Sequence, residues 1–236
     1  MPQHPQTACP ETDSSAPPMP APVAVETPSP AVAGGDRAFL DYARACQAAL
    51  SAPDPQARIA TLTEVFARDW AMPDARYMQL QPDAPYGSYL LYLSPAEDLC
   101  IVLDVFMAGQ AAVTHNHCCW GVFTCLEGVE RERLYEAPAD LSAPPVETGS
   151  RLRPTGVVTL AAPEVNAFHQ VECAEGSPRS VSLHLYGADI GRIRRQKWDA
   201  GAASYADFRG GYSNPVLDLP VYLAASEIVS GSGARA

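Results

Sequence analysis

Histidine is the residue type in this sequence whose spacing most clearly indicates metal chemistry. Besides His4 near the N-terminus, the chain has His115, His117, His169 and His184. All four lie in segments with the residue pattern of β-strands, in which side chains two residues apart point to the same side. The segment AAVTHNH therefore predicts that His115 and His117 project together, and two adjacent imidazoles can bind one metal ion.

The glycines that flank this pair favour a metal site over the simpler interpretation of a surface His-x-His pair. Five residues separate Gly109 from His115, three separate His117 from Gly121, and six more lead to Gly128. This spacing resembles the first metal-binding motif of the cupins, which implies histidines that point into a β-barrel. Gly121 stands where many cupins have a glutamate ligand, so the resemblance implies a site without that carboxylate.

The sequence is most similar to a narrower group, the thiol dioxygenases of the cysteine dioxygenase family, over roughly residues 70–215. Members of this family bind Fe(II) through three neutral histidines. The resemblance implies that His115, His117 and His169 hold an Fe2+ ion, with His169 at the place of the second cupin motif. It also implies an oxidoreductase that inserts both atoms of O2 into a thiol to give a sulfinate. Because a metal deprotonates a coordinating thiol, the substrate sulfur would supply the anionic ligand.

A second family motif, Ser-x-His-x-Tyr, follows the third ligand by thirteen residues and matches Ser182, His184 and Tyr186. Its members on one strand face imply a hydrogen-bonded chain that places the Tyr186 hydroxyl near the iron. In animal cysteine dioxygenases this tyrosine is cross-linked to a cysteine. The matching position here is Gly121, so we predict no thioether cross-link.

Two positions bear on the substrate. Cysteine-specific members have an arginine in the motif Tyr-x-Arg-x-Leu, and the segment YGSYLLYLSP has Ser88 there. Members that act on 3-mercaptopropionate use an arginine nine residues after the motif tyrosine, which matches Arg195. The resemblance thus implies a small thiol with a carboxylate, such as 3-mercaptopropionate, mercaptosuccinate or a cysteine-like compound, bound by Arg195 beside Ser88.

The elements that must position these residues follow from composition and periodicity. Residues 1–35 are rich in Pro, Ala, Ser and Thr, which predicts a disordered tail. Residues 36–215 predict one domain, and residues 216–236 predict a C-terminal extension that is flexible at its end. Two helical patterns precede eight short strand patterns, the latter at 87–93, 99–108, 111–117, 121–128, 131–137, 156–162, 167–173 and 180–187. We expect a mainly β fold, the cupin double-stranded β-helix (a jelly-roll-like barrel), with two or three N-terminal α-helices.

The composition excludes some other classes of protein. The formal net charge of −11 argues against a nucleic-acid partner. No apolar run reaches the roughly 20 residues of a membrane span, and the N-terminus does not resemble a secretory signal. Seven cysteines without paired spacing favour a reducing cytoplasm over a disulfide framework. The oligomeric state is not predicted.

Two alternatives stay open at this point. One is another metal-dependent cupin enzyme, which would not need Ser182, His184 and Tyr186. The other is a non-catalytic cupin that binds small thiols without consuming O2.

Overall fold

The computed structural model describes residues 34–69, 84–161 and 163–213. These residues form two helices and ten strands: α1 (Gly34–Ala49), α2 (Pro55–Asp69), β1 (Gly87–Leu93), β2 (Cys100–Met107), β3 (Gly121–Glu127), β4 (Val129–Glu136), β5 (Val146–Pro154), β6 (Val158–Ala161), β7 (Ala167–Cys173), β8 (Arg179–Tyr186), β9 (Arg195–Asp199) and β10 (Ser204–Phe208). The prediction of a mainly β fold with N-terminal helices is confirmed.

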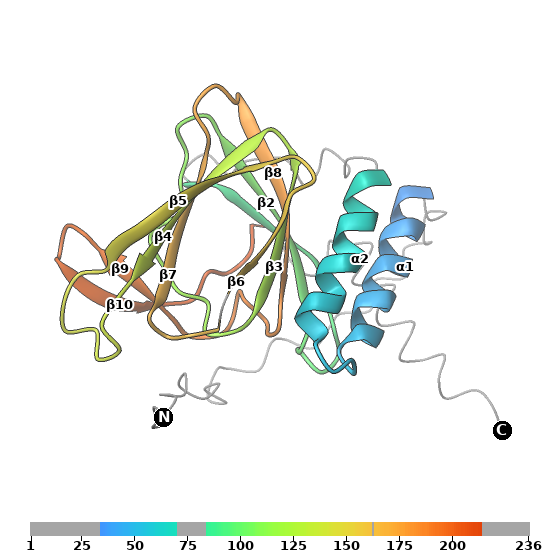
Figure 1. The fold of residues 1–236 in the computed structure, drawn as a ribbon, viewed down its shortest axis with the longest axis horizontal. Coiled ribbons are helices and arrows are strands. Elements are labelled where there is room, and N and C mark those ends of the chain that lie inside the picture. The colour runs from blue at the N-terminus through green and yellow to red at the C-terminus, as the bar shows by residue number, and fades with distance from the viewer. Residues whose placement is uncertain (1–33, 70–83, 162, 214–236) are drawn as a thin grey trace, which may run out of the picture.

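The strands form two antiparallel layers that face each other (Figure 1). One is a five-stranded sheet in the order β1-β2-β8-β3-β6. The other contains the three-stranded sheet β5-β4-β7 and the ribbon β9-β10. Residues 111–117 join these two parts, because His115 bridges His169 of β7 on one side and Lys197 of β9 on the other.

The helices cover the outer face of the five-stranded sheet, where α2 contacts β3 and β6 (Figure 1). The strand sequences explain why this sheet separates two environments. Along β8, apolar residues alternate with polar or aromatic ones, and all except Arg179 at its start are buried. Val181, Leu183 and Leu185 join the apolar core with the helices, while Ser182, His184 and Tyr186 form a hydrogen-bonded row. One strand therefore supplies both the core and the polar wall of the site.

The predicted strand at 111–117 is wrong as a regular strand. This segment forms only isolated bridges, at Ala111 and His115. The physical reason lies in Asn116, whose side-chain oxygen accepts a hydrogen bond from the backbone N–H of Gln196 at 2.9 Å. A side chain thus replaces a backbone partner of the ladder, and Cys118 then turns the chain with a φ of 56°.

The other predicted strands are present, with β1 and β7 at their predicted bounds. Three strands, β5, β9 and β10, were not predicted. The predicted tail lies outside the described residues except for residues 34 and 35, which begin α1, and the extension at 216–236 lies wholly outside them. Neither described helix is long and apolar enough to cross a membrane.

Candidate metal centre and its cavity

Three histidines meet between the two layers. One ring nitrogen from each of His115, His117 and His169 lies within 4.8 Å of the others, and all three residues are buried. Their ring centroids are 5.0 Å apart for His115 and His117, 4.7 Å for His115 and His169, and 4.5 Å for His117 and His169. The structure thus brings together the three imidazoles whose convergence the sequence predicted.

Backbone pairing holds two of these residues side by side. The N–H of His115 donates to the carbonyl of His169 at 2.9 Å, and the N–H of His169 donates back at 2.8 Å. Nδ1 of His115 is 2.7 Å from the carbonyl oxygen of Val113. Because that carbonyl can only accept, Nδ1 carries the proton, and Nε2 is left as the ligand atom.

Glu132 orients the third imidazole from behind. Its Oε1 lies 2.8 Å from Nδ1 of His169, and its Oε2 accepts a hydrogen bond from Nε of Arg151 at 2.5 Å. Burial by itself raises the pKa of Glu132, yet the contact with His169, together with Arg153 and Arg151, holds it well below its ordinary range. A carboxylate behind a histidine fixes its tautomer and increases its basicity as a metal ligand.

His117 supplies the observation that tests whether a metal fits. Its Nε2 is buried and has no hydrogen-bond partner among the described residues. Burial and the neighbouring histidines lower the pKa of His115 and of His117 well below the ordinary value, which keeps both rings neutral. Neutral imidazoles are the form that binds metals. No carboxylate belongs to this group within the described part of the chain, so the three nitrogens fit a metal ion that keeps open coordination positions.

The serine, histidine and tyrosine of β8 form the expected chain. Ser182 Oγ is 2.9 Å from Nε2 of His184, and Nδ1 of His184 is 3.0 Å from the Tyr186 hydroxyl. Burial, followed by the charge of Arg153, lowers the pKa of His184 well below its usual value. Burial raises the pKa of Tyr186 well above its usual value, so the phenol keeps its proton.

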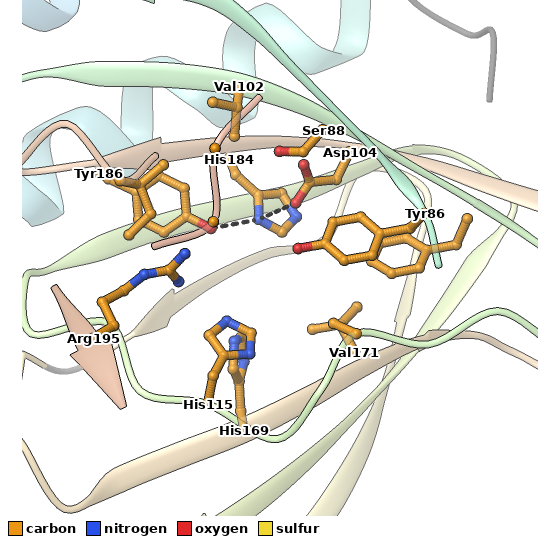
Figure 2. Close-up of a pocket in the computed structure, with 15 residues that line it drawn as sticks. Tyr86, Ser88, Val102, Asp104, His115, His169, Val171, His184, Tyr186 and Arg195 are labelled. Atoms are coloured by element: carbon orange, nitrogen blue, oxygen red, sulfur yellow. Dashed lines mark hydrogen bonds and ion pairs between the residues drawn. The ribbon is translucent and has the colours of Figure 1, made fainter. Parts of the chain in front are cut away.

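A cavity between the layers joins this chain to the histidines (Figure 2). Its volume is about 30 Å³, so its ligand must be small. Both predicted substrate residues line it, together with His115, His169 and Tyr186. Arg195 is only 6% exposed and forms no ion pair with any described residue. Its guanidinium instead lies over the ring of Phe208, 4.5 Å from the ring centre.

The comparison with known proteins concerns the fold alone. No protein-family model matches the chain. The fold is identified by the strand order and by the two antiparallel layers around a buried histidine group. The chain has the cupin fold.

Three solved structures show a weak similarity to this chain. One is a cupin 2 conserved barrel domain protein from Rhodopseudomonas palustris, with 14% identity and a TM-score of 0.37 over 52% of this chain and 75% of that one. A double-stranded β-helix protein from Klebsiella pneumoniae has 12% identity and a TM-score of 0.38 over 58% and 95%. An oxalate oxidase has 13% identity and a TM-score of 0.36 over 50% and 59%. Similarities this weak transfer no activity.

Within this cupin fold, Gly121 lies directly opposite Tyr186 in the pairing of β3 with β8. A Cβ atom at Gly121 would approach the ring of Phe123 to 2.5 Å. A side chain at this position would therefore displace the end of the Phe123 ring, and the position itself offers no side chain for a cross-link to Tyr186.

Sequence reasoning missed four charged residues around the site: Asp104, Glu130, Glu132 and Arg153. Glu130 and Arg153 form a fully buried ion pair, with 2.8 Å between Arg153 Nη2 and Glu130 Oε2. Asp104 Oδ2 lies 3.4 Å from Nδ1 of His184. The available signal was parity, because Glu130 and Glu132 are two residues apart on β4 and so share one face.

Proposed function

We propose that this protein is a non-haem Fe(II) thiol dioxygenase that converts a small carboxylated thiol (3-mercaptopropionate, mercaptosuccinate or a cysteine-like compound) into its sulfinate. The overall change is RSH + O2 → RSO2H, in which sulfur is oxidised and dioxygen is reduced without another reductant. One observation carries the proposal. One buried cavity is lined by two of the three clustered histidines, by two members of the hydrogen-bonded chain and by an arginine without an ion pair: His115, His169, His184, Tyr186 and Arg195. His117 completes the histidine group, and Ser182 contacts His184 from behind.

His115, His117 and His169 would hold the iron. When bound there, Fe2+ supplies a site that lowers the pKa of a coordinating thiol and reacts with dioxygen. The absence of a carboxylate from the histidine group suits this role, since a substrate thiolate then provides the negative charge. Glu132 keeps the His169 ring in the orientation and tautomer that binding requires.

Arg195 would bind the substrate carboxylate. A buried guanidinium without a counter-charge is costly, and a carboxylate satisfies it through two parallel hydrogen bonds. Ser88 lies in the same cavity and occupies less space than the arginine or glutamine of related enzymes. A thiol held by Arg195 would therefore lie between the histidines and Tyr186 (Figure 2).

Tyr186 would act on the oxygen atoms during transfer to sulfur. Its hydroxyl retains its proton because burial raises its pKa, and His184 holds the ring in place through the hydrogen bond at 3.0 Å. Ser182 fixes His184 from the other side. The chain thus provides an oriented hydroxyl that can donate or accept a proton inside a closed site.

Oxygen uptake by the iron-loaded protein tests the proposal. The full chain is reconstituted with Fe2+ and supplied with a panel of thiols in an oxygen electrode, and products are identified by mass spectrometry. We expect one O2 consumed for each sulfinate formed. Metal binding with no oxygen uptake on any thiol would support a small-thiol-binding cupin instead. Turnover that survives Tyr186→Phe and His184→Ala unchanged would support another metal-dependent cupin enzyme.

The setting of the reaction belongs to the same proposal. We expect a reducing cytoplasm, which suits the cysteines and a thiol substrate, and no nucleic-acid or membrane partner, which suits the net charge of −11. Fractionation of a cell extract into soluble and membrane fractions, followed by immunodetection, checks the expectation that the protein has no membrane partner.

A further inference from the structure

A buried arginine and a buried aspartate line the cavity, and neither has a charged partner there. Arg195 and Asp104 are each 6% exposed, and both face the same space. They do not pair with each other, and Figure 2 shows them on separate sides of the cavity, with Tyr186 and His184 between them. The only ion-pair contact of Asp104 among the described residues is His184, which is neutral because its pKa is lowered.

A buried guanidinium without a counter-charge and a buried carboxyl oxygen without a hydrogen bond are both unfavourable, so this arrangement points to a ligand. A ligand carboxylate would satisfy Arg195, but Asp104 would still lack a hydrogen-bond donor. The complementary group for Asp104 is a hydrogen-bond donor with a positive charge, since such bonds are the strongest that a carboxylate makes. A ligand with a carboxylate at one end and an ammonium group at the other would satisfy both residues.

The surroundings of Asp104 form a place for such a donor. Ser88 lies directly opposite Asp104 in the pairing of β1 with β2, and its side chain lowers the pKa of the carboxyl. Even so, Oδ1 of Asp104 makes no hydrogen bond of normal geometry with a described residue. Asp104 and Ser88 together present oxygen atoms that accept hydrogen bonds, and an ammonium group has three N–H donors.

The pKa of Asp104 also indicates a carboxyl group that lacks a cationic partner. Burial raises its pKa to about 7, and Glu130 adds to the increase, while Ser88, Arg195 and Arg153 lower it. A cation beside it would favour the ionised form. A second carboxylate on the ligand, in contrast, would face a like charge.

We propose that Asp104, with Ser88, is a specificity-determining residue that binds a substrate ammonium group while Arg195 binds the carboxylate. The site then selects thiols that are also amino acids over thiols with one or two carboxylates and no amine. This inference rests on the proposed function, because it narrows the substrate class of the same cavity.

Four thiols distinguish the contribution of the carboxylate from that of the ammonium group. Cysteine has both groups, 3-mercaptopropionate has the carboxylate alone, cysteamine has the ammonium alone, and 2-mercaptoethanol has neither. In the wild-type protein we expect kcat/KM for cysteine to exceed that for 3-mercaptopropionate by at least about tenfold. Asp104→Asn should lower kcat/KM for cysteine and cysteamine by about 10- to 100-fold. The value for 3-mercaptopropionate should stay within about threefold of wild type.

Matched variants control for damage to the fold. Asp41→Asn removes an exposed carboxylate on α1, far from the cavity, and should leave all four values unchanged. Asp104→Glu keeps the charge and should retain a preference for cysteine. Ser88→Ala should lower kcat/KM for cysteine in the same direction as Asp104→Asn and by a smaller factor. Equal losses on cysteine and 3-mercaptopropionate in Asp104→Asn would overturn the inference.

A binding experiment separates this inference from the proposed function. Titration calorimetry of the metal-free protein compares serine with 3-hydroxypropionate, which differ only in the ammonium group and have no thiol. We expect serine to bind at least about tenfold more tightly, and Asp104→Asn to remove this difference. If serine is preferred but no thiol is oxidised, the ammonium-binding role of Asp104 is supported and the proposed dioxygenase activity is wrong. If thiols are oxidised and the two analogues bind alike, the dioxygenase stands and the ammonium site fails.

Discussion

The two walls of the cavity differ in how they hold their functional groups. The ligand wall, made of residues 111–117 with β4 and β7, carries His115, His117 and His169. The strand wall, made of β1, β2 and β8, carries Ser88, Asp104 and the Ser182–His184–Tyr186 chain. On the ligand wall, partners behind two of the imidazoles fix their tautomers, and on the strand wall the polar groups bond to one another.

One fold thus separates metal binding from proton chemistry. The ligand wall uses an irregular segment, because two histidines two residues apart must converge with a third from β7. The strand wall uses regular alternation, because its hydroxyl and imidazole groups need only a row at the spacing of a β-strand. Substitutions on the first wall should therefore change metal binding, and substitutions on the second should change turnover.

The largest effect is expected at a histidine of the ligand wall. His115→Ala removes one of three protein ligands, so Fe2+ should no longer be retained after desalting. Iron analysis by absorption spectroscopy measures this loss. His4→Ala removes a histidine of the Pro-, Ala-, Ser- and Thr-rich N-terminal segment and is the control. Wild-type iron content in His115→Ala would show that iron binding does not depend on this histidine of the ligand wall.

On the strand wall, Tyr186→Phe should lower kcat by about 10²- to 10⁴-fold, the range over which positioned acids and bases contribute. Iron content should stay at the wild-type level, because Tyr186 is not part of the histidine group. The ratio of turnover to bound iron measures the effect. A parallel loss of iron would contradict the separation of the two walls.

Asp104 predicts a pH-dependent difference in stability. Its folded-state pKa of about 7 is raised above the ordinary value of 3.8, so between these pH values the folded chain keeps a proton that the unfolded chain releases. The wild type should lose up to about 1.4 kcal/mol of stability per pH unit as pH rises through this window, relative to Asp104→Asn. Urea unfolding of both proteins from pH 4 to 7 measures the difference. A constant difference would mean that Asp104 is ionised in the folded state.

Support behind the ligand wall should matter less than the ligands themselves. Glu132→Gln keeps the shape of the side chain but removes the charge beside His169, and we expect Fe2+ affinity to fall about 10- to 100-fold. Competition with a chelator measures the affinity. Glu136→Gln, at the exposed end of the same strand, should leave it unchanged.

Arg195→Gln should raise KM for carboxylated thiols by about 10- to 100-fold, with a smaller change in kcat, because one charge-assisted contact is lost. Steady-state oxygen uptake at varied thiol concentration separates the two parameters. Arg194→Gln removes the neighbouring charge, which lies nearer the surface and pairs with Asp207, and should have little effect. Equal KM values for both variants would show that Arg195 does not bind the substrate carboxylate.

The sequence predicted most of the strand wall, because alternation in β8 is a local pattern and the spacing of its polar residues from His169 resembles a family motif. It did not predict the irregular path of residues 111–117, since the side chain of Asn116 replaces a ladder contact with Gln196. It also missed β5, whose charged residues on an edge of the sheet lack an apolar period. Asp104 and Glu132 were missed because each acts across a strand pair, and only the three-dimensional register reveals those neighbours.

Calorimetric titration of the metal-free protein with Fe2+ under anaerobic conditions tests the central claim most directly. The account predicts one ion bound per chain in the wild type, and no binding at the same concentrations in a variant that carries His115→Ala and His169→Ala. Unchanged binding in that variant, or none in the wild type, would contradict a three-histidine metal centre.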